Sequence, residues 1–253
     1  MKLYLLAPIV CLFFLSFHAR SDVFTFVVAH DEPPLSSKFE GKVVGVIPDI
    51  INLVFNYFPT HQVKLETYPW ARAQVEVERG RADGLLTYPS ISRKVYAIFT
   101  SNTAYKLDFG YLIYNRGNIN RDAIESAASF DELKNSIMIT QTGAEWETDN
   151  IPEYIQKVEA NKLDTMFHLL FLRKQGDFLI MPPEQATYKA KILGYQNMLA
   201  YRQVDFINDS MIPFHIGLRK SHPLANEFIS EVDAIVASEQ FLKEVQTIVR
   251  SYR

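Results

Sequence analysis

The residues that lead up to Arg93 offer groups that can hold a carboxylate. A planar guanidinium makes two parallel, charge-assisted hydrogen bonds to a carboxylate. Thr87, Tyr88 and Ser90 stand in the loop before it, after a short apolar segment, and supply hydroxyls and backbone N–H groups for the same purpose. The alternative is a solvated arginine beside Lys94, with the hydroxyl residues serving only the turn.

Side chains for covalent or metal chemistry are not grouped in the sequence. One cysteine excludes an intramolecular disulfide and a cysteine-based zinc site. The chain has no H-E-x-x-H motif, no nucleophile elbow and no phosphate loop, so we expect no metal, no cofactor and no enzymatic activity. Beyond the first 21 residues the histidines are scattered: His30, His61, His168, His215 and His222.

Composition favours a folded protein that does not bind nucleic acid. The 253 residues are 48% hydrophobic and 22% charged, which is too apolar for a disordered chain and enough for one large or two small cores. The formal net charge is −3, and no run of lysine or arginine could follow a phosphate backbone.

The first residues have the pattern of an export signal. Lys2 is followed by an uncharged, mostly apolar run up to Phe17, and the small residues Ala19 and Ser21 fit the positions before a cleavage site. We therefore predict that residues 1–21 are a signal peptide cut after Ser21 and that the product is periplasmic. A membrane anchor is the alternative, but a spanning helix needs about 20 apolar residues.

The remaining chain predicts two α/β units in tandem. β-branched and aromatic runs bounded by proline or glycine indicate strands, and apolar residues at helical spacing indicate helices. The first hundred residues are predicted as strand 23–29, helix 50–58, strand 63–67, helix 70–79 and strand 82–86. Further on we predict strand 109–114, helix 129–134, strand 137–140, helix 163–174, strands 178–181 and 213–218, and C-terminal helices.

Several stretches together resemble a known family. They are VFTFVVAHDEPPL, GVIPDIINLVF, PWARAQVEVERGRADGLLTYPSISRKVYAIFTS, SFDELKNSIMITQTG and RKQGDFLI. Their order and spacing are similar to those of the bacterial extracellular solute-binding proteins of family 3. These are type II periplasmic binding proteins that deliver amino acids and other polar solutes to ABC importers. The resemblance covers nearly all of the chain after residue 21.

The resemblance implies an α/β fold of two lobes, each a β-sheet flanked by helices. Two hinge crossovers, near 109–114 and 207–217, would join the lobes, which close over a solute. Lobe 1 would comprise residues 22–110 plus 214–253, and lobe 2 residues 111–213.

The resemblance also implies roles for particular side chains. Arg93 falls where the family's carboxylate-binding arginine lies. Thr142 and Gly143 fall where a loop hydroxyl and amide meet the solute at a helix N-terminus, although a plain helix start explains them equally well. Glu32 either recognises a cation or caps a turn, and Trp70 either stacks on the ligand or packs between helix and lobe.

One position departs from the family pattern. Amino-acid binders usually carry an aspartate for the ligand's ammonium five residues after Asp177, and this chain has Pro182 there. Glu184 is a candidate replacement. The departure argues against an ordinary α-amino acid, whereas a carboxylate-bearing solute remains compatible with Arg93.

The resulting prediction is a monomeric periplasmic protein that captures a small polar, carboxylate-bearing solute for a membrane permease. Two alternatives stay open. One is a module that signals ligand binding to a membrane receptor. The other is a lyase or dehydratase on the same fold, for which Glu32 and His30 would be the acid–base candidates.

Overall fold

A computed structural model describes residues 22–252 of the chain. The predicted signal peptide, residues 1–21, lies outside this range. Among the described residues, no helix combines the length and the apolar composition that crossing a bilayer requires.

The first sheet has the strand order β5-β1-β6-β14-β7, and β8 pairs with the other end of β14. β1 is parallel to β5 and β6, whereas β14 runs antiparallel to its neighbours. The strands are β1 (Asp22–Ala29), β5 (His61–Tyr68), β6 (Gly84–Thr87), β7 (Ala97–Phe99), β8 (Tyr105–Asp108) and β14 (Met211–Arg219). The helices around it are α1 (Val46–Asn56), α2 (Trp70–Glu78), α3 (Arg93–Tyr96), α8 (Ala225–Val236) and α9 (Glu239–Ser251).

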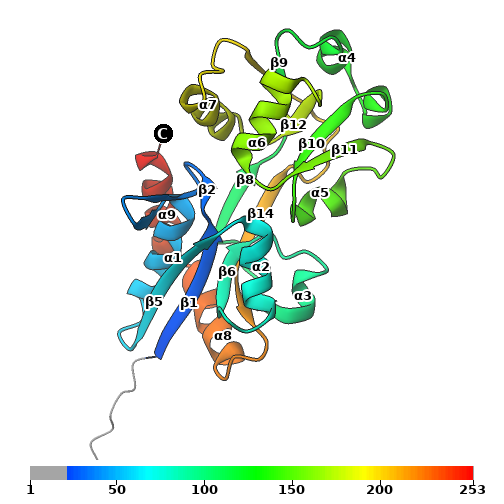
Figure 1. Ribbon diagram of the computed structural model, residues 1–253. Helices are drawn as coiled ribbons and strands as arrows, with labels where there is room; N and C mark the ends of the chain where they lie inside the picture. The colour runs from blue at the N-terminus through cyan, green and yellow to red at the C-terminus, as the bar shows by residue number, and fades with distance from the viewer. Residues whose placement is uncertain (1–21, 253) are drawn as a thin grey trace, which may run out of the picture.

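Alternation along β1 explains why helices cover both faces of this sheet. Successive strand residues point to opposite faces. Phe24 and Phe26 are fully buried in a core shared with α1, α8 and α9, whereas Val27 packs against α2 in a separate core. Each buried phenylalanine contributes roughly 1.5–3 kcal/mol, so packing on both faces fixes β1 in the sheet between β5 and β6 (Figure 1).

The second sheet has the order β11-β10-β12-β9-β13, in which β10, β11 and β12 are parallel and β9 is antiparallel to its two neighbours. Its strands are β9 (Tyr111–Asn115), β10 (Ile137–Gln141), β11 (Gln156–Ala160), β12 (Phe178–Ile180) and β13 (Leu199–Gln203). Its helices are α4 (Arg121–Ser126), α5 (Glu145–Asn150), α6 (Leu163–Phe167) and α7 (Pro183–Ile192), with a 3₁₀ turn at Phe130–Leu133 and a π-helix at His168–Arg173 that continues α6.

The second sheet is also covered on both faces. Leu112 and Tyr114 point into one core, and Ile113 between them points into the other. The same alternation places Phe178 and Leu179 of β12 in different cores. These near-continuous apolar runs are typical of strands buried on both sides.

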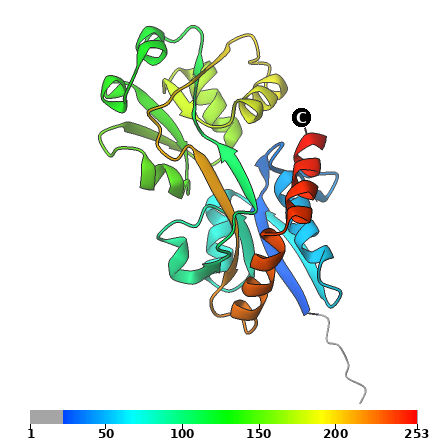
Figure 2. The ribbon, with the colours of Figure 1, turned by 180° about the vertical axis from the view of Figure 1, so that it is seen from behind.

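Two antiparallel strands, β8 and β14, run side by side toward the second sheet (Figure 2). The predicted single strand 109–114 is wrong at its start, because the structure ends β8 at Asp108 and begins β9 at Tyr111. The Asp108 carboxylate accepts a hydrogen bond from the backbone N–H of Gly110 at 2.9 Å. Such a side-chain bond two residues ahead turns the chain and interrupts a strand. The lobe boundaries at 110 and 213 stay predictions.

A small three-stranded sheet in the first lobe was not predicted from the sequence. β2 (Asp31–Glu32), β3 (Ser36–Phe39) and β4 (Lys42–Val44) form antiparallel pairs between β1 and α1. These strands are short, and most of their side chains are polar or exposed, so they lack the apolar alternation that indicates a strand. The sheet matters here because β2 carries Glu32 to the edge of the cleft.

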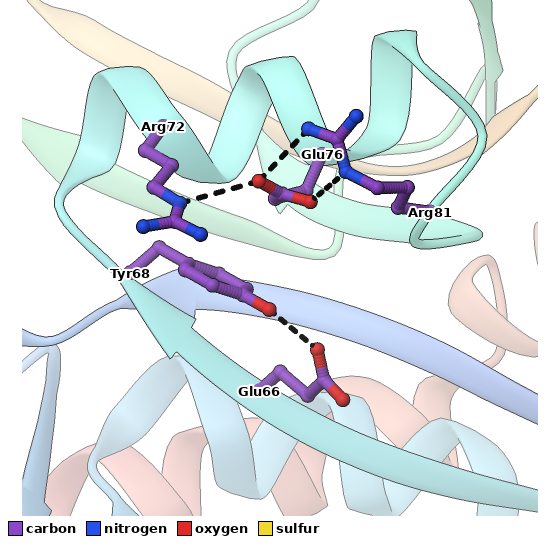
Figure 3. A network of polar contacts seen from close by, with 5 residues as sticks. All are labelled: Glu66, Tyr68, Arg72, Glu76 and Arg81. Atoms are coloured by element: carbon purple, nitrogen blue, oxygen red, sulfur yellow. Dashed lines mark hydrogen bonds and ion pairs between the residues drawn. The ribbon is translucent and has the colours of Figure 1, made fainter.

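Helix α2 is fixed to its lobe by the polar network that Figure 3 shows. The Glu76 carboxylate accepts hydrogen bonds from Arg81 at 2.5 and 3.0 Å and from Arg72 at 3.2 Å. The Arg72 guanidinium lies over the Tyr68 ring at 5.0 Å, and the Tyr68 hydroxyl donates to Glu66 at 2.8 Å. The helix that carries Trp70 and Gln74 is thereby tied to strand β5.

Candidate functional site

A cavity lies between the two lobes and is lined by residues from both sheets. Its volume, including the part open to solvent, is about 920 Å³. The walls are mainly apolar, formed by aliphatic side chains together with Phe109, Trp146 and Phe214. The polar or charged residues that line it are Glu32, Ser36, Thr87, Tyr88, Arg93, Gln141, Glu145, Glu147 and Gln185.

Arg93 lines this cavity from the start of α3 and is only 2% exposed. Its Nε donates to the Gln74 side chain at 2.9 Å, and its Nη1 donates to the backbone carbonyl of Tyr88 at 2.8 Å. The guanidinium also lies 5.2 Å from the centre of the Trp70 ring, a cation–π distance. Burial lowers the pKa of Arg93 from its usual value, although nearby Glu145 opposes that shift.

The backbone carbonyl of Gly143 accepts three hydrogen bonds from the opposite lobe. The donors are Trp70 Nε1 at 3.0 Å, Gln74 Nε2 at 3.1 Å and Arg93 Nη2 at 3.1 Å. Gly143 has a φ of +87°, and a Cβ built there would lie 2.6 Å from Gln74 Nε2. Glycine is therefore required both by the backbone conformation and by the close approach of α2.

Three further contacts cross the cleft. Gln141 Nε2 donates to the Glu32 carboxylate at 2.7 Å, and the Ser92 hydroxyl donates to Glu145 at 2.5 Å. The ammonium of Lys189, which is 3% exposed, lies 3.0 Å from the Asp31 carboxylate. Together with the Gly143 carbonyl, these contacts join the two lobes around the cavity.

Two of the acidic side chains in the cavity wall, those of Glu147 and Glu32, have a raised pKa. Glu147 on α5 is 5% exposed and accepts a hydrogen bond from the Thr140 hydroxyl. Burial raises the pKa of Glu147 to about 8, so its carboxyl is mostly protonated at pH 7. Burial also raises the pKa of Glu32, while the hydrogen bond from Gln141 opposes the rise.

Several of the predicted site residues line one cavity, namely Arg93, Thr87, Tyr88, Trp70 and Glu32. Ser90 lies behind the cavity wall, where its hydroxyl accepts from the Arg93 backbone N–H at 3.3 Å. The Thr142 backbone N–H donates to the Ala160 carbonyl at 3.0 Å. Of the neighbouring pair, Gly143 contributes a carbonyl rather than the expected amide.

The structure places Glu184 away from the cavity wall. It is exposed on α7 and is not among the described residues that line the cavity, whereas its neighbour Gln185 is buried and lines it. Successive helical residues are separated by about 100° around the axis. The helix therefore presents the amide, not the carboxylate, to the cleft.

Three residues that line the cavity were not predicted from the sequence: Phe109, Trp146 and Glu147. Trp146 is 5% exposed, and its ring meets that of Phe109 edge to face at 5.4 Å. Trp146 and Glu147 could have been suspected from their position in the sequence, because they follow the predicted loop at Thr142 by only a few residues. Which of those residues would face the cleft depends on where α5 begins.

Comparison with known proteins shows the fold through solved structures. No family model matches the sequence, and no curated protein matches it. The crystal structure of the substrate-binding protein of an amino acid ABC transporter is 17% identical, with 91% of this chain and 98% of that chain covered and a TM-score of 0.70. An arginine third transport system periplasmic binding protein from Legionella pneumophila is 15% identical, with 92% and 100% covered and a TM-score of 0.70.

A third similar structure is that of an ancestral amino acid-binding protein described as a precursor of cyclohexadienyl dehydratase. It is 16% identical, with 91% of this chain and 95% of that chain covered and a TM-score of 0.68. The predicted fold class is thereby confirmed: the chain has the two-lobed α/β fold of the periplasmic binding proteins.

Proposed function

We propose that this protein is a periplasmic solute-binding protein that closes its two lobes over a small molecule and presents it to a membrane ABC importer. The observation that carries the proposal is the cavity between the sheets, which both lobes line. The paired strands β8 and β14 are the candidate hinge. Closure around such connections is a common mechanism of ligand capture.

We further propose that Arg93 helps to hold a carboxylate of the solute. A guanidinium carries five N–H groups, and three of them bond to Gln74, Tyr88 and Gly143. The two that remain, one on each terminal nitrogen, belong to a buried side chain in the cavity wall, with the Tyr96 hydroxyl as a further neighbour of the guanidinium. Thr87 lines the same cavity and can add a hydroxyl donor.

A thermal-melt screen of the mature protein, followed by small-angle scattering, tests the binding role. A ligand present at about 100 times its Kd stabilises the folded state by roughly 2.7 kcal/mol. Amino acids, dicarboxylates, polyamines and small peptides form the first panel. We expect at least one class to raise Tm and to reduce the radius of gyration at saturation. Binding with unchanged dimensions would contradict hinge closure.

The role of Arg93 is tested by Arg93→Ala, with Lys94→Ala as the matched control. Lys94 is the exposed neighbour of Arg93 and does not line the cavity. We expect Arg93→Ala to abolish the Tm shift of carboxylate-bearing ligands and Lys94→Ala to leave it unchanged. A shift that survives in Arg93→Ala means that the carboxylate is held elsewhere.

Catalysis is less well supported by the geometry. Of the acid–base pair suggested by the sequence, Glu32 lines the cavity, but His30 is not among the described residues that do. Recovery of the ligand unchanged after incubation with the protein is the expected result. A chemically altered ligand would favour an enzyme instead.

A further inference from the structure

The cavity wall has more acidic than basic side chains among the described residues. Three carboxyl side chains line it, those of Glu32, Glu145 and Glu147, whereas Arg93 is the one cationic side chain among the described lining residues. The Arg93 guanidinium already donates to three oxygens of the protein. The cavity therefore has more capacity to accept hydrogen bonds from a cation than to donate them to an anion.

Glu147 is a buried acidic residue of the cavity wall that has an unused acceptor oxygen and an aromatic neighbour, Trp146. One carboxyl oxygen bonds to the Thr140 hydroxyl, and the other has no hydrogen-bond partner within residues 22–252. Trp146 precedes it in α5 and is buried in the same wall. A buried carboxyl with a free oxygen beside aromatic rings suits a ligand that carries an ammonium group on an apolar body.

The other two carboxyl groups are already bonded across the cleft. Glu32 accepts from Gln141, and Glu145 accepts from the Ser92 hydroxyl. Both bonds link the lobes and use one oxygen of each carboxyl group, whereas the bond to Glu147 comes from Thr140 of the same lobe. The nearest charges that act on Glu147 from outside the cavity are those of Lys157 and Glu159 on β11. Lys157 Nζ donates to the backbone carbonyl of Glu147 at 3.4 Å and leaves its carboxyl free.

We propose that Glu147 binds the ammonium group of a small apolar or aromatic amine. Glu147 thereby supplies the acidic contact that Pro182, at the position where amino-acid binders usually carry an aspartate, cannot make. This inference rests on the proposed solute-binding function and names the chemical class of the solute. The apolar body of the amine lies against Trp146, Phe109 and the aliphatic walls, where its burial contributes roughly 25 cal/mol per Å².

Binding is coupled to the release of a proton. The amine arrives as R–NH₃⁺, the O–H bond of the Glu147 carboxyl breaks, the proton passes to solvent, and the carboxylate accepts an N–H of the ammonium. Because burial raises the pKa of Glu147 to about 8, this carboxyl carries its proton at pH 7 in the empty protein. We expect the release of nearly one proton per ligand at pH 7 and an affinity that rises as the pH increases toward 8, where the ammonium group of the ligand is still protonated.

The test uses matched probes that differ only in their charged group. 2-Phenylethylamine carries the amine, 3-phenylpropionate the carboxylate, and L-phenylalanine both; isopentylamine, 4-methylpentanoate and L-leucine form the aliphatic set. Calorimetric titration in phosphate and in Tris buffer gives both the affinity and the number of protons released. We expect the amines and the amino acids to bind with proton release, and the simple carboxylates to bind at least about tenfold more weakly.

Variants assign the effect to a residue. Glu147→Gln has the shape of the protonated carboxyl and is expected to fold, which its melting curve checks. It should lower amine affinity at least about tenfold and remove both proton release and pH dependence. Glu159→Gln removes an exposed acid on the adjacent strand whose charge raises the pKa of Glu147; it should retain both amine binding and proton release. If Glu32→Gln, not Glu147→Gln, removes the proton release, the assignment to Glu147 is overturned.

The outcomes separate this inference from the function on which it rests. Binding of the carboxylates in preference to the amines would overturn the amine assignment and leave the solute-binding function intact. Binding of none of the six probes, together with no hit in the wider melt screen, would overturn both.

Discussion

The backbone carbonyl oxygen of Gly143 lies 3.1 Å from Nη2 of Arg93, so the buried guanidinium is hydrogen-bonded across the cleft to the opposite lobe. Trp70 and Gln74 donate to the same oxygen. A carbonyl has two lone pairs, so three donors converge on an acceptor that can satisfy only two of them fully. This cluster of donors holds a loop of lobe 2 against α2 of lobe 1.

Gly143→Ala should separate the lobes. The added Cβ would lie 2.6 Å from Gln74 Nε2 and 3.3 Å from the Cα of Ala71, at a φ of +87°. We expect a larger radius of gyration in scattering, weaker ligand binding and a loss of about 1–2 kcal/mol of stability from the strained backbone.

Gly80→Ala is the matched control for this variant. Gly80 has a φ of +70°, but no atom lies within 4 Å of a Cβ placed there. The Gly80→Ala substitution therefore introduces similar backbone strain without a steric clash. It should lower Tm and leave the radius of gyration and the ligand affinity unchanged. Equal expansion in both variants would show that strain, not the contact with α2, is responsible.

The buried ammonium of Lys189 pairs with two carboxylates that differ in location. Asp31 belongs to β2 in the first lobe, and Asp164 belongs to α6 beside the second sheet. We expect Asp31→Asn to weaken closure and to lower ligand affinity, because it removes the ion pair between lobes. Asp164→Asn leaves that pair in place. We expect it to reduce the free energy of unfolding by about 1–3 kcal/mol, which lowers Tm, and to change ligand affinity less than Asp31→Asn does.

Scattering and calorimetry on the two variants check this difference. Each variant replaces one aspartate partner of Lys189 by asparagine, so each serves as the control for the general destabilisation that the other causes. An equal loss of affinity in Asp31→Asn and Asp164→Asn would mean that the ion pair to Asp31 does not contribute to closure.

Much of the fold could be predicted from local patterns. Residues 23–29 are mostly β-branched or aromatic, and the structure has strand β1 at this place. Side chains of this kind suit a strand that is buried on both faces, as β1 is over most of its length. The small sheet β2–β4 could not be predicted, since Ser36–Phe39 and Lys42–Val44 are mostly polar or exposed and are ordered by packing against α1. Its position depends on contacts that are distant in the sequence.

The site was predictable only in part, for a related reason. Arg93 stands out through the family resemblance, which places it at the carboxylate-binding position, whereas its residue type and the hydroxyl-rich loop alone also fit a solvated arginine. Glu147 does not stand out in the same way, because its acidity follows from burial beside Trp146 and Thr140 and not from any sequence pattern. For Glu184 and Gln185, one position along α7 decides which side chain faces the cleft.

Glu147 should make the stability of the unliganded protein fall as the pH rises. Its pKa is raised from 4.5 to about 8 in the folded state, so between these values the folded protein binds a proton that the unfolded chain has released. The contribution of Glu147 to stability is then greatest below pH 4.5 and declines through pH 8, by about 3 kcal/mol between pH 4.5 and 7. Denaturant unfolding across this range measures the slope.

Glu147→Gln isolates this contribution, because the amide does not titrate. We expect the variant to have a shallower decline above pH 5 and to become more stable than wild type near pH 8, where the wild-type carboxyl must ionise in its buried site. Parallel profiles for the two proteins between pH 5 and 8 would contradict the raised pKa.

Glu76 should have the opposite dependence on pH. Its hydrogen bonds from Arg81 and Arg72 (Figure 3) lower the pKa of the carboxyl from 4.5 to about 2. The stabilisation is therefore complete above pH 4.5 and is lost as the pH falls toward 2. We expect Glu76→Gln to lower Tm at pH 7 and to differ less from wild type as the pH approaches 2. Glu78→Gln on the same helix, where Glu78 is exposed, should leave Tm nearly unchanged throughout, and a deficit in Glu76→Gln that persists at pH 2 would show that packing, not charge, explains it.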